Sequence, residues 1–256
     1  CSTLACIMTM PLPFSLAVAR ESSRPYIAKG IVAGIIASPV SMIGVALACD
    51  YSLWNTLKLG APAFIIALVL ALFLTFMRNG TIRAFMVLGR LMVGAFALLL
   101  AVAALENFFH VTIIPGMASI KPQLGIVGEI GVMLAGAYPM VYFVKGYFKK
   151  GLHAMAACFR IDDNAALGML VSIANPLPMY TMIDTMSNRG KVICSAFSAP
   201  VLCMLGDHLG FMSAFYPEGI TPLLAGKFLS ALAALVIALL FEMLSPSEED
   251  AKDCGA

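Results

Sequence analysis

The amino-acid sequence predicts an all-α protein, a polytopic bundle of transmembrane helices in which some helices are broken or re-entrant. Of its 256 residues 61% are hydrophobic and 12% are charged, and the mean hydropathy is +0.95, whereas about a quarter of the residues in a soluble domain are charged. Several apolar runs approach the ~20 residues that a membrane-spanning helix needs. One of them, Ala165 to Ala174, ends at Asn175-Pro176-Leu177-Pro178. Two prolines so close together remove two backbone donors, so no continuous helix is expected there.

Eight apolar segments are candidates for membrane spans, and the last one is close enough to the chain end to leave only a short acidic tail. We expect residues 1–241 to form a transmembrane transporter domain and residues 242–256 to form the tail. Because the chain starts at Cys1 without a basic region or a cleavage site, we expect a fragment rather than a signal peptide. The segments run roughly over residues 1–18, 26–48, 59–77, 84–104, 124–144, 163–182, 191–206 and 219–241.

The basic residues indicate which loops face the cytoplasm. Lys and Arg gather in the loops 19–29, 78–90 and 145–160, whereas the loops between them carry single lysines. The positive-inside rule therefore places these three loops inside. Beyond residue 162 two topologies remain. A spanning broken helix puts Arg189 and Lys191 outside, and a re-entrant hairpin that turns at residues 175–178 keeps them inside, which the loop charge favours.

A pattern that occurs twice in the chain supports the topology in which the broken helix spans the membrane. Residues 9–14 read TMPLPF and are followed by Ser38-Pro39-Val40, and residues 174–180 read ANPLPMY and are followed by Ala199-Pro200-Val201. An odd number of spans between such copies would make an inverted repeat, which is common in secondary transporters with paired broken helices. That arrangement requires residues 163–182 to span, so both topologies stay open here.

Three polar residues lie at or after the predicted break. Asn175 offers a donor and acceptors that suit a hydroxyl, although Asn also caps helices. Asp207 and His208 lie between glycines in LGDHLGF (205–211), and an adjacent acid and imidazole can bind a cation or pass a proton. Their structural alternative is an interfacial loop. Asp162 to Asn164 are better explained as the N-cap of the helix that follows.

Two further candidates lie in the segment 124–144. Glu129 shares a helical face with Gly125, Met133 and Gly136, so it should face the bundle and not lipid. Its structural alternative is a buried ion pair with Lys227, and Lys227 itself could extend toward the membrane surface. Tyr138 either packs in the core or presents a π-face to an ammonium group.

The composition argues against several classes of function. The net charge is +2 and the basic residues form no single patch, so nucleic-acid binding is not expected. The seven cysteines form no CxxC pair and the three histidines lie in separate segments, so we expect no metal or other cofactor. A membrane-embedded enzyme is the second hypothesis, but it would lack a nucleophile with a placed base.

Four motifs closely resemble the EutH family of ethanolamine-utilisation transporters: MLAGAYPM (133–140), DDNAALGMLVSIANPLPM (162–179), NRGKVI (188–193) and LGDHLGF (205–211). The resemblance runs through most of the chain and corresponds to the C-terminal portion of the family chain. It implies a multi-pass protein of the bacterial inner membrane, not an enzyme, that moves ethanolamine inward to feed its degradation in a microcompartment. Transport of another small amine or amino alcohol is the alternative, and association into a homo-oligomer is left open.

Overall fold

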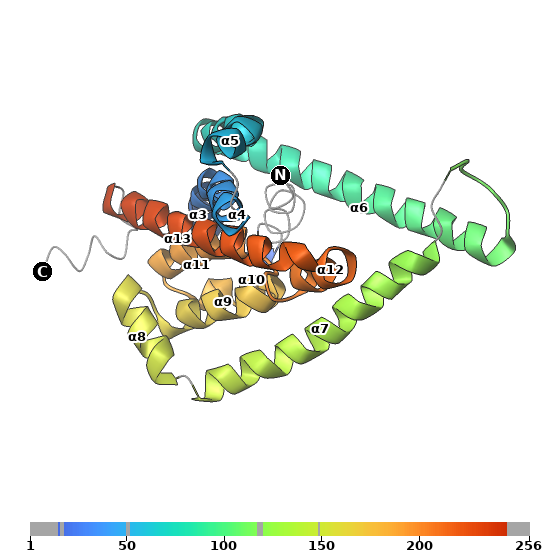
Figure 1. The fold of residues 1–256 in the computed structure, drawn as a ribbon. Coiled ribbons are helices and arrows are strands. Elements are labelled where there is room, and N and C mark those ends of the chain that lie inside the picture. Colours follow the sequence, from blue (N-terminus) through green and yellow to red (C-terminus); the bar gives the residue numbers. More distant parts are fainter. Residues whose placement is uncertain (1–14, 16–17, 50–51, 117–119, 148, 245–256) are drawn as a thin grey trace, which may run out of the picture.

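The computed structural model describes residue 15 and residues 18–49, 52–116, 120–147 and 149–244. These residues form helices and turns, and no strand occurs among them, which confirms the all-α prediction (Figure 1). The α-helices are α3 (Arg24–Ala37), α4 (Ser41–Ala48), α5 (Leu53–Phe76), α6 (Arg78–Phe109), α7 (Ile120–Tyr147), α8 (Lys149–Phe159), α9 (Asp163–Ala174), α10 (Pro176–Thr181), α11 (Asn188–Val201), α12 (Asp207–Phe215) and α13 (Ile220–Leu244). Short 3₁₀ turns η1 (Ser38–Val40), η2 (Ile183–Thr185) and η3 (Pro217–Gly219) connect some of them.

The helices follow the apolar segments that the sequence predicts. Helices α5, α6, α7 and α13 each cover one expected segment, and the expected segment 26–48 is divided into α3, η1 and α4. The segment 1–18 lies almost entirely outside the described residues. Among the described residues, the two segments Arg24–Ala48 and Pro217–Leu244 are long and apolar enough to cross a membrane.

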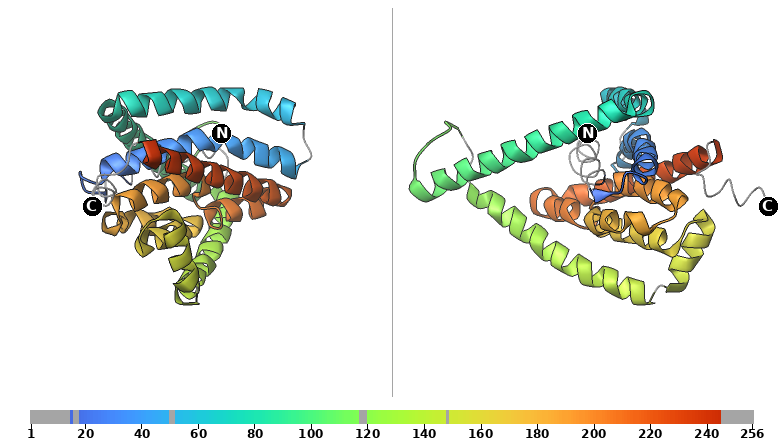
Figure 2. Two further views of the ribbon diagram at one scale, coloured as in Figure 1. Left: turned by 90° about the vertical axis from the view of Figure 1, so that its left-hand side faces the viewer. Right: turned by 180° about the vertical axis from the view of Figure 1, so that it is seen from behind.

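The core lies where α3, α9, α11 and α13 pack together. Helices α5 and α6 lie beside this bundle. The end of α6 lies near the start of α7, and the two helices diverge from there, so the bundle lies between the start of α6 and the end of α7 (Figures 1 and 2). Trp54, in the first turn of α5, is exposed, with the Lys58 ammonium 5.1 Å from its ring centroid, as suits a residue at a membrane interface. The core includes the buried residues Ile27, Ile31, Ile35, Met169, Met179, Ile193 and Leu235.

Helices α3 and α11 are parallel neighbours held at close range by two glycines. A Cβ on Gly30 would overlap the Val192 carbonyl oxygen, and a Cβ on Gly34 would come within 2.5 Å of the Ala199 Cβ. The pairing advances in the same direction along both helices, so they run parallel. These are the helices that end at the two Pro-Val copies, and an inverted repeat would make them antiparallel. This parallel pairing does not agree with the inverted repeat, which the sequence left open as one of two alternatives.

The close approach at Gly30 predicts a large difference between two Gly→Ala variants. In Gly30→Ala the new methyl meets main-chain atoms of α11 that cannot move aside, so we expect a loss of roughly 1–3 kcal/mol in unfolding free energy, as in overpacked cores. Gly94→Ala in α6 is the matched control, because a methyl group at this position would have no atom within 4 Å beyond the adjoining backbone of its own helix. It should gain up to about 1 kcal/mol from helix propensity. Thermal unfolding in detergent measures both, and equal effects would contradict the packing described.

The break between α3 and α4 arises from Pro39. The N–H of Ser41 donates to the carbonyl of Ser38 and not to that of Ala37, so the chain tightens into a 3₁₀ turn and frees the Ala37 carbonyl. The buried Ser230 hydroxyl of α13 donates to this oxygen at 2.9 Å. A neighbouring helix thus satisfies the freed acceptor, as a buried break requires.

Residues 162–187 form a hairpin. Asp162 is the N-cap of α9 and accepts from Ala165 N–H at 3.0 Å, which confirms its predicted capping role. Its other carboxylate oxygen accepts from the Ser187 N–H at 2.8 Å and hydroxyl at 2.7 Å. Since Ser187 is the N-cap of α11, the chain enters through α9, turns after Asn175, and returns to its starting side.

The returning end of the hairpin meets the basic loop that precedes α3. The Arg20 N–H donates to the Asp184 carboxylate at 3.1 Å, and Lys191 lies near the Tyr26 ring. Arg189 and Lys191 therefore lie on the same side as the loop 19–29. Of the two topologies that remained open, the geometry agrees with the hairpin.

The Asp162 carboxylate predicts an acid-sensitive hairpin. Burial alone would raise its pKa, but hydrogen bonds from the Ser187 hydroxyl and from the Ser187 and Ala165 N–H groups together lower it below its usual value. A lowered folded-state pKa stabilises the fold above the unfolded-state value, and this contribution disappears as the pH falls through the folded-state pKa. We expect Asp162→Ala to cost roughly 2 kcal/mol at neutral pH, from a lost N-cap and lost charged hydrogen bonds.

The neighbouring Asp163 provides the control for this prediction. Its side chain is 56% exposed and pairs with His153, and such surface pairs contribute about 0–1 kcal/mol. The melting temperature of the unaltered protein should fall between neutral and acid pH, and the Asp162→Ala variant should lack this fall. A parallel pH dependence in Asp162→Ala and the unaltered protein would assign the acid sensitivity to another group.

Candidate functional site

Two helix breaks meet in the middle of the bundle. Helix α11 ends at Val201, and a turn in which Cys203 has a φ of 50° leads to α12. The Leu205 N–H of this turn donates to the Ile173 carbonyl at 2.9 Å. The turn therefore lies against the last turn of α9, immediately before Asn175. This contact joins the two motifs that the sequence singled out.

Asn175 occupies the first of these breaks. It is the C-cap of α9, with φ −154° and ψ 125°, and its N–H donates to the Val171 carbonyl at 2.9 Å. Pro176 then begins α10 and contributes no N–H. Asn175 is only 8% exposed, so an amide with donors and acceptors is held inside an apolar bundle.

His208 lies at the second break, in the first turn of α12. Its Nδ1 lies 2.8 Å from the Leu202 carbonyl oxygen. A carbonyl oxygen only accepts, so Nδ1 must carry the proton of this bond. In the neutral ring the other nitrogen, Nε2, then has the lone pair, so it can accept a hydrogen bond from an ammonium or hydroxyl group.

Lys227 is the residue whose role the sequence did not reveal. It is 3% exposed, and its Nζ donates to the Leu202 carbonyl at 2.9 Å and to the Pro200 carbonyl at 3.2 Å. The expectation that it extends toward the membrane surface is wrong, because its head group is buried against α11. The predicted ion pair with Glu129 stays a prediction, because the Glu129 side chain lies outside the described part of the structure.

The Lys227 acceptors are freed by the break itself. In a continuous helix the N–H groups of Met204 and Gly206 would bond to Pro200 and Leu202, but they donate instead to Val201 and Cys203. Two carbonyl oxygens at the C-terminal end of α11 are thereby left for a side-chain donor, and the helix dipole makes this end favourable for a cation. Proline and glycine spacing signals such a break, but no local pattern indicates which distant lysine reaches it.

The remaining predicted residues lie on elements around the same point. Asp207 is the first residue of α12, directly after Gly206. Glu129 and Tyr138 belong to α7, which contacts both α12 and α9. The side chains of Asp207, Glu129 and Tyr138 lie outside the described part of the structure.

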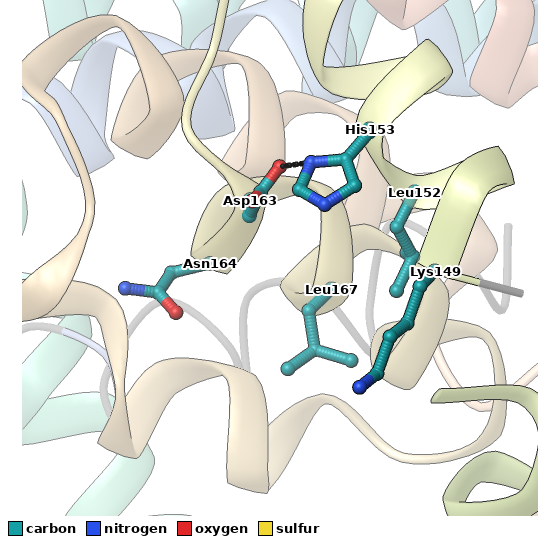
Figure 3. Close-up of a pocket in the computed structure, with 6 residues that line it drawn as sticks. All are labelled: Lys149, Leu152, His153, Asp163, Asn164 and Leu167. Atoms are coloured by element: carbon teal, nitrogen blue, oxygen red, sulfur yellow. Dashed lines mark ion pairs between the residues drawn. The ribbon is translucent and has the colours of Figure 1, made fainter. Parts of the chain in front are cut away.

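A pocket on the side where α9 begins is separate from the breaks. It lies between α8 and the first turns of α9, and the His153 Nδ1 is 2.9 Å from an Asp163 carboxylate oxygen (Figure 3). Its polar lining carries both signs of charge, from Lys149 and Asp163. It lies about two turns of α9 before Asn175, so it is no part of the site at the breaks.

Comparison with known proteins gives consistent matches. The family model described as "Ethanolamine utilisation protein, EutH" matches residues 1–241. The "Probable ethanolamine permease EutH" of Listeria monocytogenes is 32% identical over 89% of this chain and 61% of its own length. The proteins of the same name from Escherichia coli and Salmonella typhimurium are 32% and 31% identical, over 93% and 94% of this chain and 63% and 64% of their own lengths.

These matches extend over nearly the whole chain, which itself spans about three fifths of the length of these relatives. No solved structure shows a significant match. The family model covers both helix breaks and ends within the last turn of α13. By sequence, this chain belongs to the EutH family of ethanolamine utilisation proteins.

Proposed function

We propose that this protein is a multi-pass permease of the bacterial cytoplasmic membrane that takes up ethanolamine and binds it at the two helix breaks. The observation that carries the proposal is the hydrogen bond between Leu205 and Ile173, which brings together the segments that carry Asn175 and His208. Secondary transporters place their substrates at such interrupted helices near the middle of the bilayer. The names of the relatives provide the substrate.

The polar groups at the breaks suit the two ends of ethanolamine. Its hydroxyl can donate to and accept from the Asn175 amide, and its ammonium needs a carboxylate, which we assign to Asp207 with Glu129 as the second candidate. The Nε2 of His208 is a further acceptor. Tyr138 would offer a π-face to the ammonium.

Uptake into proteoliposomes tests this function. The whole purified protein should accumulate labelled ethanolamine unchanged at low external concentration and acid pH, where the protonated amine does not cross a bilayer unaided. Mass spectrometry of the recovered label separates transport from chemistry. Conversion of the amine by the purified protein alone would overturn the permease in favour of a membrane-embedded enzyme.

The membrane topology that accompanies this proposal is tested with single cysteines. Thr185, in η2, is exposed and makes a better reporter than Ser187, whose hydroxyl binds Asp162. In a cysteine-depleted protein in intact cells, Thr185→Cys should resist an impermeant thiol reagent and react only after permeabilisation. Glu218→Cys, exposed in η3 at the other end of α12, should react from outside. Labelling of Thr185→Cys in intact cells would show that residues 163–182 span the membrane.

A further inference from the structure

The two carbonyl oxygens that hold Lys227 form a site for a primary ammonium group. Both belong to the end of α11, both lose their helical partners at the break, and both accept from the same Nζ. A primary ammonium carries three hydrogen-bond donors and a compact charge, which fits acceptors that converge on one point. Burial of Lys227 keeps water from competing for them.

The group that fills this site is chemically the same as one end of ethanolamine. Lys227 Nζ and the ethanolamine nitrogen are both primary ammonium groups on a methylene carbon. The Leu202 oxygen also accepts a hydrogen bond from His208 Nδ1, so the two carbonyls lie next to a residue that is proposed to bind substrate. Two ammonium groups cannot share these oxygens, because like charges repel strongly where little water screens them.

We propose that the carbonyls of Pro200 and Leu202 hold a primary ammonium group next to the carboxylate proposed above: that of Lys227 when no substrate is bound, and that of ethanolamine during transport. The assignment rests on the proposed function. The four-carbon stem of lysine is flexible enough to withdraw Nζ without moving α13. Lys227 then replaces the substrate ammonium in the empty protein. The empty binding site can therefore change from inward-facing to outward-facing while both carbonyls keep a hydrogen-bond donor.

A comparison of net uptake with exchange tests the assignment. Exchange of labelled for unlabelled ethanolamine never requires the empty binding site to turn from the inside to the outside, whereas net uptake requires this step in every cycle. Lys227→Met keeps the stem and removes the ammonium. We expect net uptake to fall roughly tenfold to a hundredfold, the factor that a charge-assisted hydrogen bond contributes, while exchange stays close to that of the unaltered protein.

Ser230→Ala is the matched control, because Ser230 lies one turn further along the same face of α13 and donates to the Ala37 carbonyl, at the break between α3 and α4. It should leave the ratio of exchange to net uptake unchanged. If Lys227→Met lowers both rates in the same proportion, Lys227 only holds the structure and the assignment is wrong. If the unaltered protein shows neither rate, the proposed function fails before Lys227 is tested.

A binding measurement tests the ammonium site at the Pro200 and Leu202 carbonyls without measuring transport. The whole protein carrying Lys227→Ala is extracted in methylammonium, so that folding does not depend on the missing side chain, and its melting temperature is then measured in different salts. Methylammonium should raise the melting temperature of Lys227→Ala and leave the unaltered protein unchanged. Tetramethylammonium, which has no N–H donor, should have no such effect. Equal responses to the two cations would overturn the ammonium site.

Discussion

Asp207→Asn is expected to raise the apparent KM for ethanolamine about thirtyfold or more while the protein still inserts and folds. Asp207 begins α12 directly after the turn that joins the two breaks. A carboxylate there would compensate the charge of the substrate away from bulk water. Loss of such a desolvated charge partner costs about 2–5 kcal/mol, and each ~1.4 kcal/mol is a factor of ten.

The controls for this prediction separate Asp207 from other acids and from its neighbour. Glu218→Gln changes an exposed acid of η3 and should leave KM unaltered. His208→Ala removes a neighbouring hydrogen-bonding group and no carboxylate, so it should raise KM less than Asp207→Asn does. Normal uptake by Asp207→Asn together with inactive Glu129→Gln would move the substrate carboxylate to α7.

Breaking the ion pair between α3 and α13 is expected to destabilise the protein by roughly 3 kcal/mol, the lower end of the cost of removing one partner from a buried pair, because the Lys29 side chain is 20% exposed. Lys29 Nζ lies 2.6 Å from a Glu242 carboxylate oxygen, and the Glu242 side chain has no exposed surface. Glu242→Leu leaves the ammonium of Lys29 without this partner, and Lys29→Met leaves a buried carboxylate without its cation. Melting temperatures in detergent should fall in both variants.

The double variant Lys29→Met/Glu242→Leu provides the decisive comparison. Apolar side chains of similar size often replace a buried ion pair without loss, so the double variant should recover most of the stability that each single variant loses. Additive losses would show that the two residues stabilise the fold through separate contacts.

The sequence predicts that Glu242 lies in the acidic tail, yet α13 continues to Leu244, three residues past the expected boundary.

Helix positions were predictable because each depends on information within a single segment. Apolar runs of membrane length predict α5, α6, α7 and α13, and the closely spaced Pro176 and Pro178 predict the end of α9, because each removes a backbone N–H. The break at Pro39 was not predicted, and single prolines also lie inside the continuous helices α5, α7 and α11. The cap at Asp162 was predictable for the same local reason. The choice between hairpin and span was not, since it depends on Asp162 reaching Ser187 25 residues away.

The candidate site was predictable only in part. Asn175 and His208 stand out because polar groups are rare in apolar segments, and the structure joins their segments through Leu205 and Ile173. Lys227 stands out for the same reason, but its partners are main-chain oxygens of another helix, which carry no residue-specific signal. Ser230 has no signal either, because a serine within an apolar helix ordinarily bonds to its own backbone.

Lys227 and Ser230 connect α13 both to the end of α11 and to the break between α3 and α4. They lie three residues apart, on one face of the helix, and they satisfy the freed carbonyls of α11 and of α3 respectively. A slide of α13 by the ~1.5 Å rise of a single residue would stretch both sets of hydrogen bonds at once. Any shift of α13 along its axis would therefore disturb the end of α11 and the break between α3 and α4 together, whereas rotation of the Lys227 side chain alone would affect only α11.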